Sequence, residues 1–277
     1  MNKKKIKIIS GTMAVSTLVT IFVLEKKAEK TTYQANTVEA VEERKLCIYE
    51  KYIKRIVDVI CSAGAIVVFL PLYIGVAVLV KLKLGSPVLF TQERPGLTKA
   101  GKETIFKMYK FRTMTDERDE NGELLPDEAR LTRFGKWLRS TSLDELPETI
   151  NILNGTMSVI GPRPQLVRDM VFMTKEQRKR HTAKPGLSGL AQINGRNDID
   201  WEDKLEWDLK YIQNVGFLTD LKIAADTVSK AFVKREGITE GDMATAEDFG
   251  DYLLSRGKIS QKEYDSKQAE ARELLGK

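Results

Sequence analysis

The chain of 277 residues contains a single histidine, His181, and only two cysteines, Cys47 and Cys61. One histidine makes a Ser-His-Asp or Cys-His nucleophile system hard to build, and it nearly excludes tetrahedral zinc held by His and Cys. Two cysteines, one of them inside an apolar run, form no disulfide framework and fit a reducing cytosol. Catalytic chemistry must therefore rest on carboxylates, Lys and Arg side chains, with a hard cation such as Mg²⁺ as the candidate cofactor.

Charge is unevenly distributed along the chain. The net charge is +6, but residues 236–277 hold ten acidic and six basic side chains, so residues 1–235 carry +10. A cationic body suits an anionic membrane face or a phosphate-rich substrate. Nucleic acid is the competing partner, and we expect none because neither an aromatic-interleaved platform nor a recognition-helix pattern is present. A composition of 42% hydrophobic and 30% charged residues excludes a disordered chain and a fully membrane-buried bundle.

Two runs lack charged side chains, residues 8–24 and residues 59–80. The first follows four lysines and has the form of a signal peptide, but no convincing small-residue cleavage site follows it. We expect an uncleaved anchor over residues 1–30 and a polar linker over residues 31–50, with a cleaved leader as the alternative. The orientation of the anchor stays open because both flanks are basic.

The second run predicts a membrane helix over residues 51–84. Its uncharged residues, at about 1.5 Å each, would just cross a hydrocarbon core, so composition alone favours a spanning helix. Pro71 lies in mid-run, where it removes a helix hydrogen bond, and a helix that enters and leaves on one face is the alternative. Because a charge is costly in lipid, Lys54, Arg55 and Asp58 are predicted at the membrane interface, with Arg55 or Lys54 as the partner of Asp58.

From Gly85 onward the pattern is that of a globular domain. Residues 87–92 and 105–112 predict short strands, with Pro95-Gly96 and Asn121-Gly122 as turns. Residues 201–233 carry a helical pattern, and residues 249–275 predict two short charged helices around Gly257.

A helix is also predicted from Pro126 to about Arg139, since acidic residues occupy its first turn and basic residues its last. Leu131, Phe134 and Leu138 line one face, with Trp137 alongside. The helix either dips this face into lipid or covers the core as an ordinary helix.

The segment Ser142-Leu143-Asp144-Glu145-Leu146-Pro147 predicts a helix start. Ser142 and Glu145 have the spacing of a capping box, whereas Pro147 favours a slightly later start with Asp144 at or next to the N-cap. Taken alone, Asp144 is most simply a capping residue. The chemical alternative is that the helix dipole and N-terminal amides hold the Asp144 carboxylate ionised, so that one carboxylate of the pair attacks while the other holds Mg²⁺.

Basic residues surround this carboxylate pair in the sequence, and the candidate phosphate ligands are Lys110, Arg112, Arg139 and Arg163. Prolines on both sides of Arg163 fix the backbone, so its guanidinium can be aimed at a phosphate with little entropy left to lose. Any one of these residues is more often a solvated surface charge. Together they resemble the clamp on a diphosphate that phosphoryl transfer needs.

Two further segments carry candidate contacts. Asn194-Gly195-Arg196-Asn197 predicts a turn, in which Asn194 and Arg196 are candidate substrate ligands or only turn residues. His181 follows Arg178-Lys179-Arg180 and is expected in a basic surface patch rather than in catalysis.

Several motifs follow one another in a fixed order: Lys54-Arg55-x-x-Asp58, the Pro-broken apolar run, Phe90-Thr91-Gln92-x-Arg94-Pro95-Gly96, Lys110-Phe111-Arg112-Thr113-Met114, Ser142-Leu143-Asp144-Glu145-Leu146, and Met157-Ser158-Val159-Ile160-Gly161-Pro162-Arg163-Pro164. In this order they resemble the bacterial sugar transferase family, the monotopic phosphoglycosyl transferases that begin glycan assembly on undecaprenyl phosphate. The resemblance covers roughly residues 48–235. It is nearest to the small members that transfer phospho-N,N′-diacetylbacillosamine.

For the fold, the resemblance implies an α+β chain. A re-entrant, Pro-broken membrane helix over residues 51–84 replaces the span that composition favours, and a compact, mostly helical cytoplasmic domain with a small β-sheet follows over residues 85–235. Both helix ends would lie on the cytoplasmic side of the bacterial membrane. Leu70 departs from the serine that the nearest relatives have there, which leaves one hydroxyl fewer for the freed carbonyls. The charged tail, residues 236–277, faintly resembles helical hairpins of oligomerising proteins, so an oligomer or partner contact is expected there.

For the activity, the resemblance implies that Asp144 attacks the β-phosphate of a UDP-sugar, releases UMP, and carries the phospho-sugar until undecaprenyl phosphate takes it. Glu145 would help to bind Mg²⁺ or assist the acceptor, and Arg163 would hold phosphate. A 2-acetamido sugar is the expected cargo. Two other classes stay open: an inactive membrane scaffold whose tails recruit partners, and a Mg²⁺-dependent phosphohydrolase of lipid diphosphates, which would have no use for a UDP-sugar site.

Overall fold

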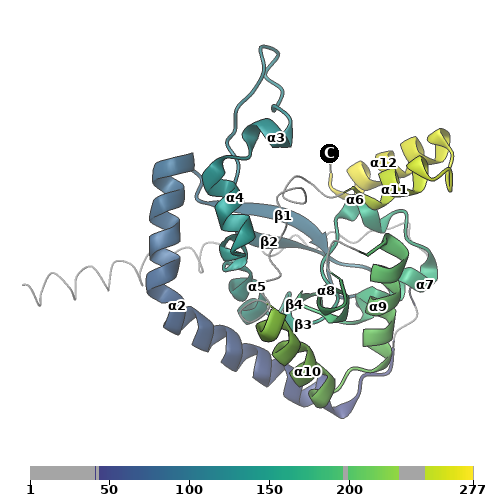
Figure 1. Cartoon of the computed structure of the whole chain (residues 1–277). Coiled ribbons are helices and arrows are strands. Elements are labelled where there is room, and N and C mark those ends of the chain that lie inside the picture. Colours follow the sequence, from purple (N-terminus) through teal and green to yellow (C-terminus); the bar gives the residue numbers. More distant parts are fainter. Residues whose placement is uncertain (1–40, 42–43, 196–198, 231–246, 277) are drawn as a thin grey trace, which may run out of the picture. The chain divides into compact units, whose positions relative to one another are not determined.

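The computed structural model describes residues 41, 44–195, 199–230 and 247–276. The predicted anchor over residues 1–30, and most of the linker over residues 31–50, lie outside this part of the chain. Within it, one long helix leads into a domain of short helices and two small sheets (Figure 1). The predicted α+β fold is therefore confirmed.

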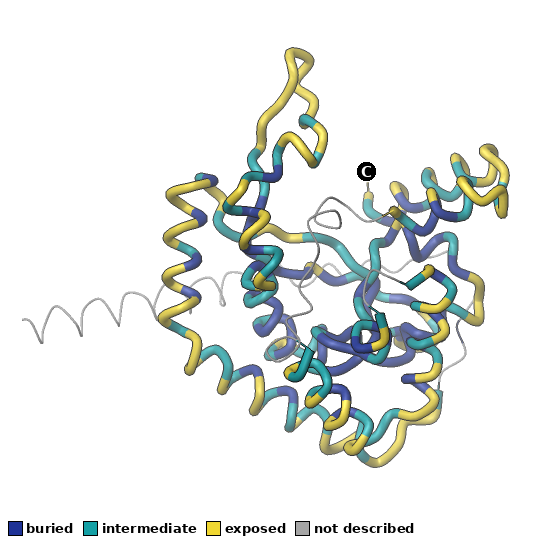
Figure 2. Tube along the Cα trace, in the orientation of Figure 1, coloured by how far each residue is buried: buried dark blue, intermediate teal, exposed yellow. Residues whose placement is uncertain are grey.

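The membrane segment begins with a π-helical turn, η1 (Tyr49–Ile53), and continues as α2 (Lys54–Leu84). Figure 1 shows α2 bent into two arms, and Pro71, which has no N–H to bond the preceding turn, lies inside it. Among the residues that the structure describes, this is the one helix long and apolar enough to cross a membrane. Only 11% of its most apolar stretch is buried within the protein, and exposed residues run along both arms (Figure 2).

Both arms of α2 pack against the same domain. The second arm buries residues that recur every three or four positions, the spacing of one helix face: Tyr73, Val76, Val80 and Leu84. These residues form a cluster with Phe111 and Leu138. The first arm contacts α5 (Glu148–Asn154) and β3 (Ser158–Ile160). The start and the end of the membrane helix are thus fastened to one body.

The first sheet is the predicted hairpin of β1 (Leu89–Pro95) and β2 (Ile105–Phe111), paired antiparallel with Leu89 opposite Phe111. The predicted turn at Pro95-Gly96 is wrong, because Gly96 N–H still donates to the Thr104 carbonyl oxygen at 2.7 Å and the chain reverses beyond it. The turn at Asn121-Gly122 is confirmed, with Gly122 at φ 81°.

A second, parallel sheet joins β3 to β4 (Gly186–Ser188). Just beyond β3 the two segments leave no room for a side chain, since a Cβ on Gly161 would lie 2.2 Å from the Lys184 carbonyl oxygen. A Cβ on Gly186 would lie 2.1 Å from the Gly161 nitrogen. This crossing fixes the point at which the chain enters residues 161–166, which we call the Arg163 loop.

The helix predicted from Pro126 is in fact two helices, α3 (Asp127–Arg130) and α4 (Arg133–Ser140). Leu131 between them is extended and bridges to Met114. The Thr132 side chain then accepts a hydrogen bond from Gly135 N–H and starts the second helix as its N-cap.

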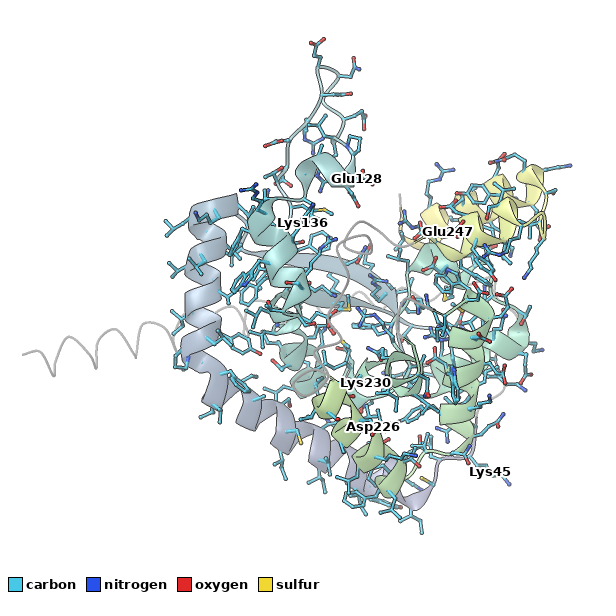
Figure 3. All side chains as sticks on the ribbon, in the orientation of Figure 1. Lys45, Glu128, Lys136, Asp226, Lys230 and Glu247 are labelled. Atoms are coloured by element: carbon cyan, nitrogen blue, oxygen red, sulfur yellow. The ribbon has the colours of Figure 1, made fainter. Side chains whose placement is uncertain are left out.

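One face of α4 covers the core and the other points away from it. Leu138 is fully buried in the cluster formed with the second arm of α2. Trp137 and Lys136 are exposed, and Lys136 is labelled in Figure 3. The core-covering interpretation of this helix therefore holds for its inner face, while Trp137 stays available at the surface.

The remaining chain is a series of helices. Up to residue 193 they are short: α6 (Val167–Met170), α7 (Lys175–Arg178), the 3₁₀ turn η3 (Lys179–Thr182) and α8 (Leu190–Ile193). Two longer helices then fill the region predicted to be helical: α9 (Trp201–Gln213) and α10 (Phe217–Val228). Among these helices, α10 packs against β3 and β4, and α6 packs against β1. The tail forms the two predicted helices, α11 (Phe249–Ser255) and α12 (Gln261–Leu274), which turn about Gly257 at φ 65°.

Candidate active site

Asp144 lies in a tight turn before α5 and not at the helix N-cap. Ser142 is left-handed (φ 54°), one 3₁₀ turn, η2 (Leu143–Glu145), follows, and α5 begins at Glu148 with Pro147 as its N-cap. The predicted capping box is wrong, because the Ser142 side chain makes no capping hydrogen bond and Glu145 pairs elsewhere. The later helix start that Pro147 favoured is confirmed, and the turn leaves the Asp144 side chain buried.

Glu145 is the centre of an ion-pair cluster. Its Oε1 lies 2.8 Å from Lys110 Nζ on β2 and 2.8 Å from Arg163 Nη2. Lys110 also lies 3.3 Å from Oε1 of Glu148, which is buried in the first turn of α5. Three segments distant in sequence, namely β2, the turn before α5 and the Arg163 loop, thus meet at one carboxylate.

The three carboxyl groups of this region differ in acidity. Burial opposes ionisation of Glu145, but the charges of Lys110 and Arg163 outweigh it and hold the pKa of Glu145 well below its ordinary value. Burial, and then the Glu145 charge, raise the pKa of Asp144 to about 6 and that of Glu148 to about 7. The pKa of Asp144 is therefore raised, whereas a helix N-terminus alone would lower it, but at about 6 it still leaves the carboxylate mostly ionised at neutral pH.

Two of the predicted arginine ligands have different surroundings. Arg139 donates from Nε to Thr113 Oγ1 at 3.2 Å, and its positive charge opposes the rise in the pKa of Asp144, so it belongs to the neighbourhood of the cluster. Arg112 instead donates to the carbonyl oxygens of Met114 and Ser86, both at 2.8 Å, and pairs with Asp116 at 2.7 Å. These contacts fasten the end of β2, and they give no support to the predicted phosphate contact of Arg112.

A buried ionic network holds the backbone of the Arg163 loop. Arg180 donates from Nη2 to the Arg163 carbonyl oxygen at 2.6 Å and pairs with Asp208 at 2.6 Å. Arg94 donates from Nη1 to the Pro164 carbonyl oxygen at 3.3 Å. The loop that carries Arg163 is therefore held through two consecutive peptide groups by two other arginines.

The predicted basic patch around His181 is wrong. Arg178, Arg180 and His181 are all buried, and buried acids compensate them. Glu103 accepts from Arg178 at 3.0 Å and lies 2.7 Å from His181 Nδ1. Burial lowers the pKa of His181. His181 is thus an interior residue.

The motif before the membrane run serves as an anchor within the protein. Asp58 is buried and its Oδ1 accepts from Ser158 Oγ and from Val159 N–H, both at 2.9 Å, so the prediction of Arg55 or Lys54 as its partner is wrong. Arg55 donates to the last carbonyl oxygens of α5, and Lys54 pairs with Asp220 on α10. The partners of Lys54, Arg55 and Asp58 thus all come from the folded domain, and their place at a membrane interface stays a prediction.

Residues 49–234, more than half of the chain, match the family model described as bacterial sugar transferase. The chain belongs to the bacterial sugar transferase family. The resemblance drawn from the ordered motifs is confirmed, and with it the expectation of a transferase enzyme.

Characterised and uncharacterised relatives of this bacterial sugar transferase share its matched region. An uncharacterised sugar transferase of Bacillus subtilis (strain 168), EpsL, is 50% identical over 190 residues, which cover 69% of this chain and 89% of EpsL. A UDP-glucose:undecaprenyl-phosphate glucose-1-phosphate transferase of Klebsiella pneumoniae is 40% identical over 192 residues, 66% of this chain and 40% of the relative. A UDP-N-acetylgalactosamine-undecaprenyl-phosphate N-acetylgalactosaminephosphotransferase of Aeromonas hydrophila is 37% identical, over 64% of this chain and 43% of the relative. The match thus spans less than half of the last two proteins.

The side chains of the transferase that could bind Mg²⁺ would need a substrate to complete the metal site. Within the described ranges no three His, Cys, Asp or Glu side chains come together as a metal site. Mg²⁺ is commonly bound by one or two carboxylates plus substrate phosphates and water. Asp144 and Glu145 are the carboxylates that would hold it, and Glu145 Oε1 is paired with Lys110 and Arg163. The residues present therefore fit the expected ion.

The remaining predicted contacts lie away from this cluster or outside the described chain. Asn194 is exposed at the end of α8 and donates from its side chain to the Leu190 carbonyl oxygen at 2.8 Å. Arg196 lies outside the residues that the structure describes. Sequence reasoning missed Glu148, although its position three residues after Glu145 places it near that side chain on a helical turn. It also missed Arg180 and Asp208, whose pairing no local spacing indicates.

Proposed function

We propose that this protein transfers a sugar 1-phosphate from a UDP-sugar to undecaprenyl phosphate through a phospho-sugar carried on Asp144, with UMP as the first product. One observation carries the proposal: a buried, basic carboxyl at Asp144 adjoins a carboxylate that two cations hold, Lys110 and Arg163. The Klebsiella and Aeromonas relatives are named for transfer from UDP-sugars to undecaprenyl phosphate, which supports the donor and the acceptor.

The chemistry assigned to Asp144 is a double displacement at phosphorus. A carboxylate oxygen of Asp144 attacks the β-phosphorus of the donor, the bond from that phosphorus to the bridging oxygen breaks, and UMP leaves with the bond electrons. An oxygen of the lipid phosphate then attacks the same phosphorus and releases the Asp144 carboxylate. A carboxylate with a raised pKa is a better nucleophile than an ordinary aspartate, while at pH 7 it is still mostly ionised.

The cations of the cluster supply charge neutralisation in this scheme. Phosphoryl transfer depends mainly on positioning and on neutralising the charge of the phosphoryl oxygens. Lys110 and Arg163 already converge on Glu145, and the donor diphosphate would exchange part of that contact for its own oxygens. Asp144 and Glu145 would hold Mg²⁺, which when bound neutralises diphosphate charge.

The structure supports a membrane helix that enters and leaves on one face. A straight helix of 31 residues is about 46 Å long, so a spanning α2 would place its ends on opposite sides of a core about 30 Å thick. Here Asp58 near the start bonds Ser158, and Leu84 at the end packs with Phe111, all in one domain. The cationic body and the free thiols of Cys47 and Cys61 favour the cytoplasmic side.

Exposed apolar side chains extend this membrane surface beyond α2. They run from η1 and the first arm onto α10: Ile48, Tyr52, Ile56, Phe217, Leu218 and Leu221. The Tyr49 and Phe217 rings lie 5.9 Å apart edge to face, so the two elements are neighbours. We infer that this surface lies in the interfacial zone of the bilayer.

For the donor we propose a 2-acetamido sugar. The Aeromonas relative is named for such a sugar and the Klebsiella relative for glucose, so the choice is open to a direct test. UMP release is measured with purified protein, undecaprenyl phosphate, Mg²⁺ and a panel of UDP-linked sugars. Release with UDP-N-acetyl sugars well above release with UDP-glucose supports this donor class, and the reverse order overturns it.

The covalent step has its own test. Incubation with UDP-sugar radiolabelled in the sugar, without lipid acceptor, should give a protein-bound phospho-sugar that mass spectrometry places on Asp144, and Asp144→Asn should carry none. Turnover retained in that variant contradicts the nucleophile assignment. Free inorganic phosphate from lipid diphosphates, without a sugar-lipid product, would indicate the phosphohydrolase, and no UMP from any donor would indicate the scaffold.

A further inference from the structure

The C-terminal hairpin of α11 and α12 lies beyond the residues that match the family, and it packs on the helix that follows the Arg163 loop. Ala271 and Leu274 of α12 are buried in one cluster with Val167, Met170 and Val171. Phe249 and Tyr252 of α11 form a second cluster with Met173, Trp201 and Leu205. An oligomerising hairpin would present this apolar face to a partner chain. Here the face packs against α6 and α9 of the same chain.

A buried carboxylate links this hairpin to the loop by hydrogen bonds. Asp169 of α6 accepts from Leu166 N–H through Oδ2 at 3.0 Å and from Phe249 N–H through Oδ1 at 2.9 Å. Leu166 is the last residue of the Arg163 loop, and Phe249 is the first residue of α11. One side chain therefore bridges the end of the loop and the start of the hairpin.

Further contacts set the hairpin against α6. Arg168 pairs with Asp248 at 2.7 Å, and a Cβ on Gly250 would lie 2.6 Å from the Phe172 ring, so the backbone of α11 rests on that ring. Trp201 Nε1 donates to the carbonyl oxygen of Glu247, which is labelled in Figure 3, at 3.0 Å. The start of the hairpin is therefore held from two sides.

Movement at Leu166 would reach Arg163 with little loss. Only two residues separate them, and Pro162 and Pro164 restrict the backbone on both sides of Arg163. The Arg163 guanidinium lies 2.8 Å from Glu145. A support at Leu166 thus acts on the cation that the proposed function places at the donor diphosphate.

We propose that the C-terminal hairpin is a positioning element of the transferase, which acts through Asp169 to hold the Arg163 loop in place for the UDP-sugar. This inference rests on the proposed function, because it takes Arg163 as a ligand of the donor. Asp169 and the hairpin touch no substrate in this account. Their effect is on donor affinity, so KM for the UDP-sugar should change more than kcat does.

Replacing Phe249 by two different residues isolates the bridging hydrogen bond in the full chain. Phe249→Ala and Phe249→Pro both remove the ring, but only Phe249→Pro removes the N–H that Asp169 accepts. Proline is well tolerated at the first position of a helix, and Asp248 (φ −68°, ψ 155°) already has the conformation that a following proline requires. The pair therefore differs mainly in one hydrogen bond.

We expect amide exchange at Leu166 and KM for the UDP-sugar to be about two- to tenfold higher in Phe249→Pro than in Phe249→Ala, the range that one hydrogen bond is worth. Equal Leu166 exchange and equal KM in the two variants would overturn the proposal. Exchange is read without substrate. If the protein releases no UMP from any donor but Leu166 still exchanges faster in Phe249→Pro than in Phe249→Ala, the proposed function is contradicted. The link from Phe249 to Leu166 through Asp169 is then still supported.

A second pair tests the hairpin as a whole. Ala271 is buried against α6 while Ala269 is exposed two residues earlier on the same helix. Ala271→Asp should release α12, seen as faster exchange of its amides, and raise KM for the UDP-sugar several-fold, whereas Ala269→Asp should change neither. Release of α12 with wild-type KM and wild-type Leu166 exchange would show that the hairpin does not support the loop.

Discussion

Arg180 donates a hydrogen bond of 2.6 Å to the backbone carbonyl oxygen of Arg163. Arg163 therefore reaches Glu145 from a backbone that a second, fully buried arginine holds, and Asp208 neutralises that second arginine. Buried ion pairs contribute little net stability, because desolvation offsets their attraction. Their use here is geometric, since the planar guanidinium of Arg180 serves a carboxylate and a carbonyl at once.

Arg180→Lys should separate geometry from charge. Lysine keeps a positive charge opposite Asp208, but its compact ammonium cannot reproduce the planar fork that serves both acceptors. We expect kcat/KM for UMP release to fall about tenfold, with a loss of a few degrees in the melting temperature. The matched control is Arg118→Lys, because Arg118 also donates to a backbone carbonyl, that of Gly122, on an exposed turn. If Arg180→Lys lowers the melting temperature but leaves kcat/KM unchanged, Arg180 contributes to stability only and does not position Arg163.

The rate of UMP release should depend on pH through Asp144. Its pKa is raised to about 6, mainly by burial and then by Glu145, so the attacking carboxylate is ionised above pH 6 and protonated below it. We therefore expect kcat/KM for the UDP-sugar, which reports ionisation of the free enzyme, to be level from pH 7 to 8 and to fall about tenfold for each unit below about pH 6. Lys110 lowers the pKa of Asp144, so Lys110→Met should move the fall to higher pH as well as reduce the rate. A flat profile between pH 5 and 8 would contradict this assignment.

Gly161→Ala should be among the most damaging single substitutions. The added Cβ would lie 2.2 Å from the Lys184 carbonyl oxygen, a backbone atom that cannot move without breaking the β3–β4 crossing. We expect a loss of more than about 3 kcal/mol in the free energy of unfolding, measured by urea in mild detergent. Gly216→Ala is the control, because its Cβ would meet only Thr219 Oγ1, at 3.9 Å. Comparable stability of the two variants would mean that the crossing is looser than the structure shows.

Asp58→Ala should detach the first arm of α2 from the domain. The change leaves Ser158 Oγ and Val159 N–H without their acceptor, and each buried unsatisfied group costs about 1–3 kcal/mol. Thermal unfolding in detergent should report this loss. Asp116→Ala removes a largely exposed carboxylate paired with Arg112 and should change stability by less than about 1 kcal/mol. Equal effects of the two substitutions would argue against the anchoring role of Asp58.

Local patterns predicted the elements of the fold well. The strands at β1 and β2, the turn at Gly122 and the two tail helices follow from alternation, glycine and charge within a few residues. The break between α3 and α4 was missed, because it depends on Leu131 bridging to Met114, a contact across 17 residues of chain. Periodicity along one segment carries no information about such a partner.

The site was predictable as a set of residues and not as a set of partners. The ordered motifs predicted that Lys110, Glu145 and Arg163 belong to one site, and in the structure Lys110 and Arg163 both pair with Glu145. The helix end that was expected to hold Asp144 ionised does not set its pKa, which burial and the Glu145 charge raise. The charges of Arg178 and Arg180 were assigned to the surface because the acids that neutralise them, Glu103 and Asp208, lie 75 and 28 positions away.

Both arms of α2 contact one domain. In the proposed re-entrant arrangement, the hydrophobic length of the helix therefore does not have to equal the thickness of the bilayer. A straight hydrophobic span must tilt or deform the bilayer when acyl chains change, whereas a re-entrant α2 bent at Pro71, as proposed above, would only have to reach a given depth. Vesicles made with short or long acyl chains should therefore support similar rates. The thickness of the host membrane would then place little constraint on which bacteria or membrane regions can use such an enzyme.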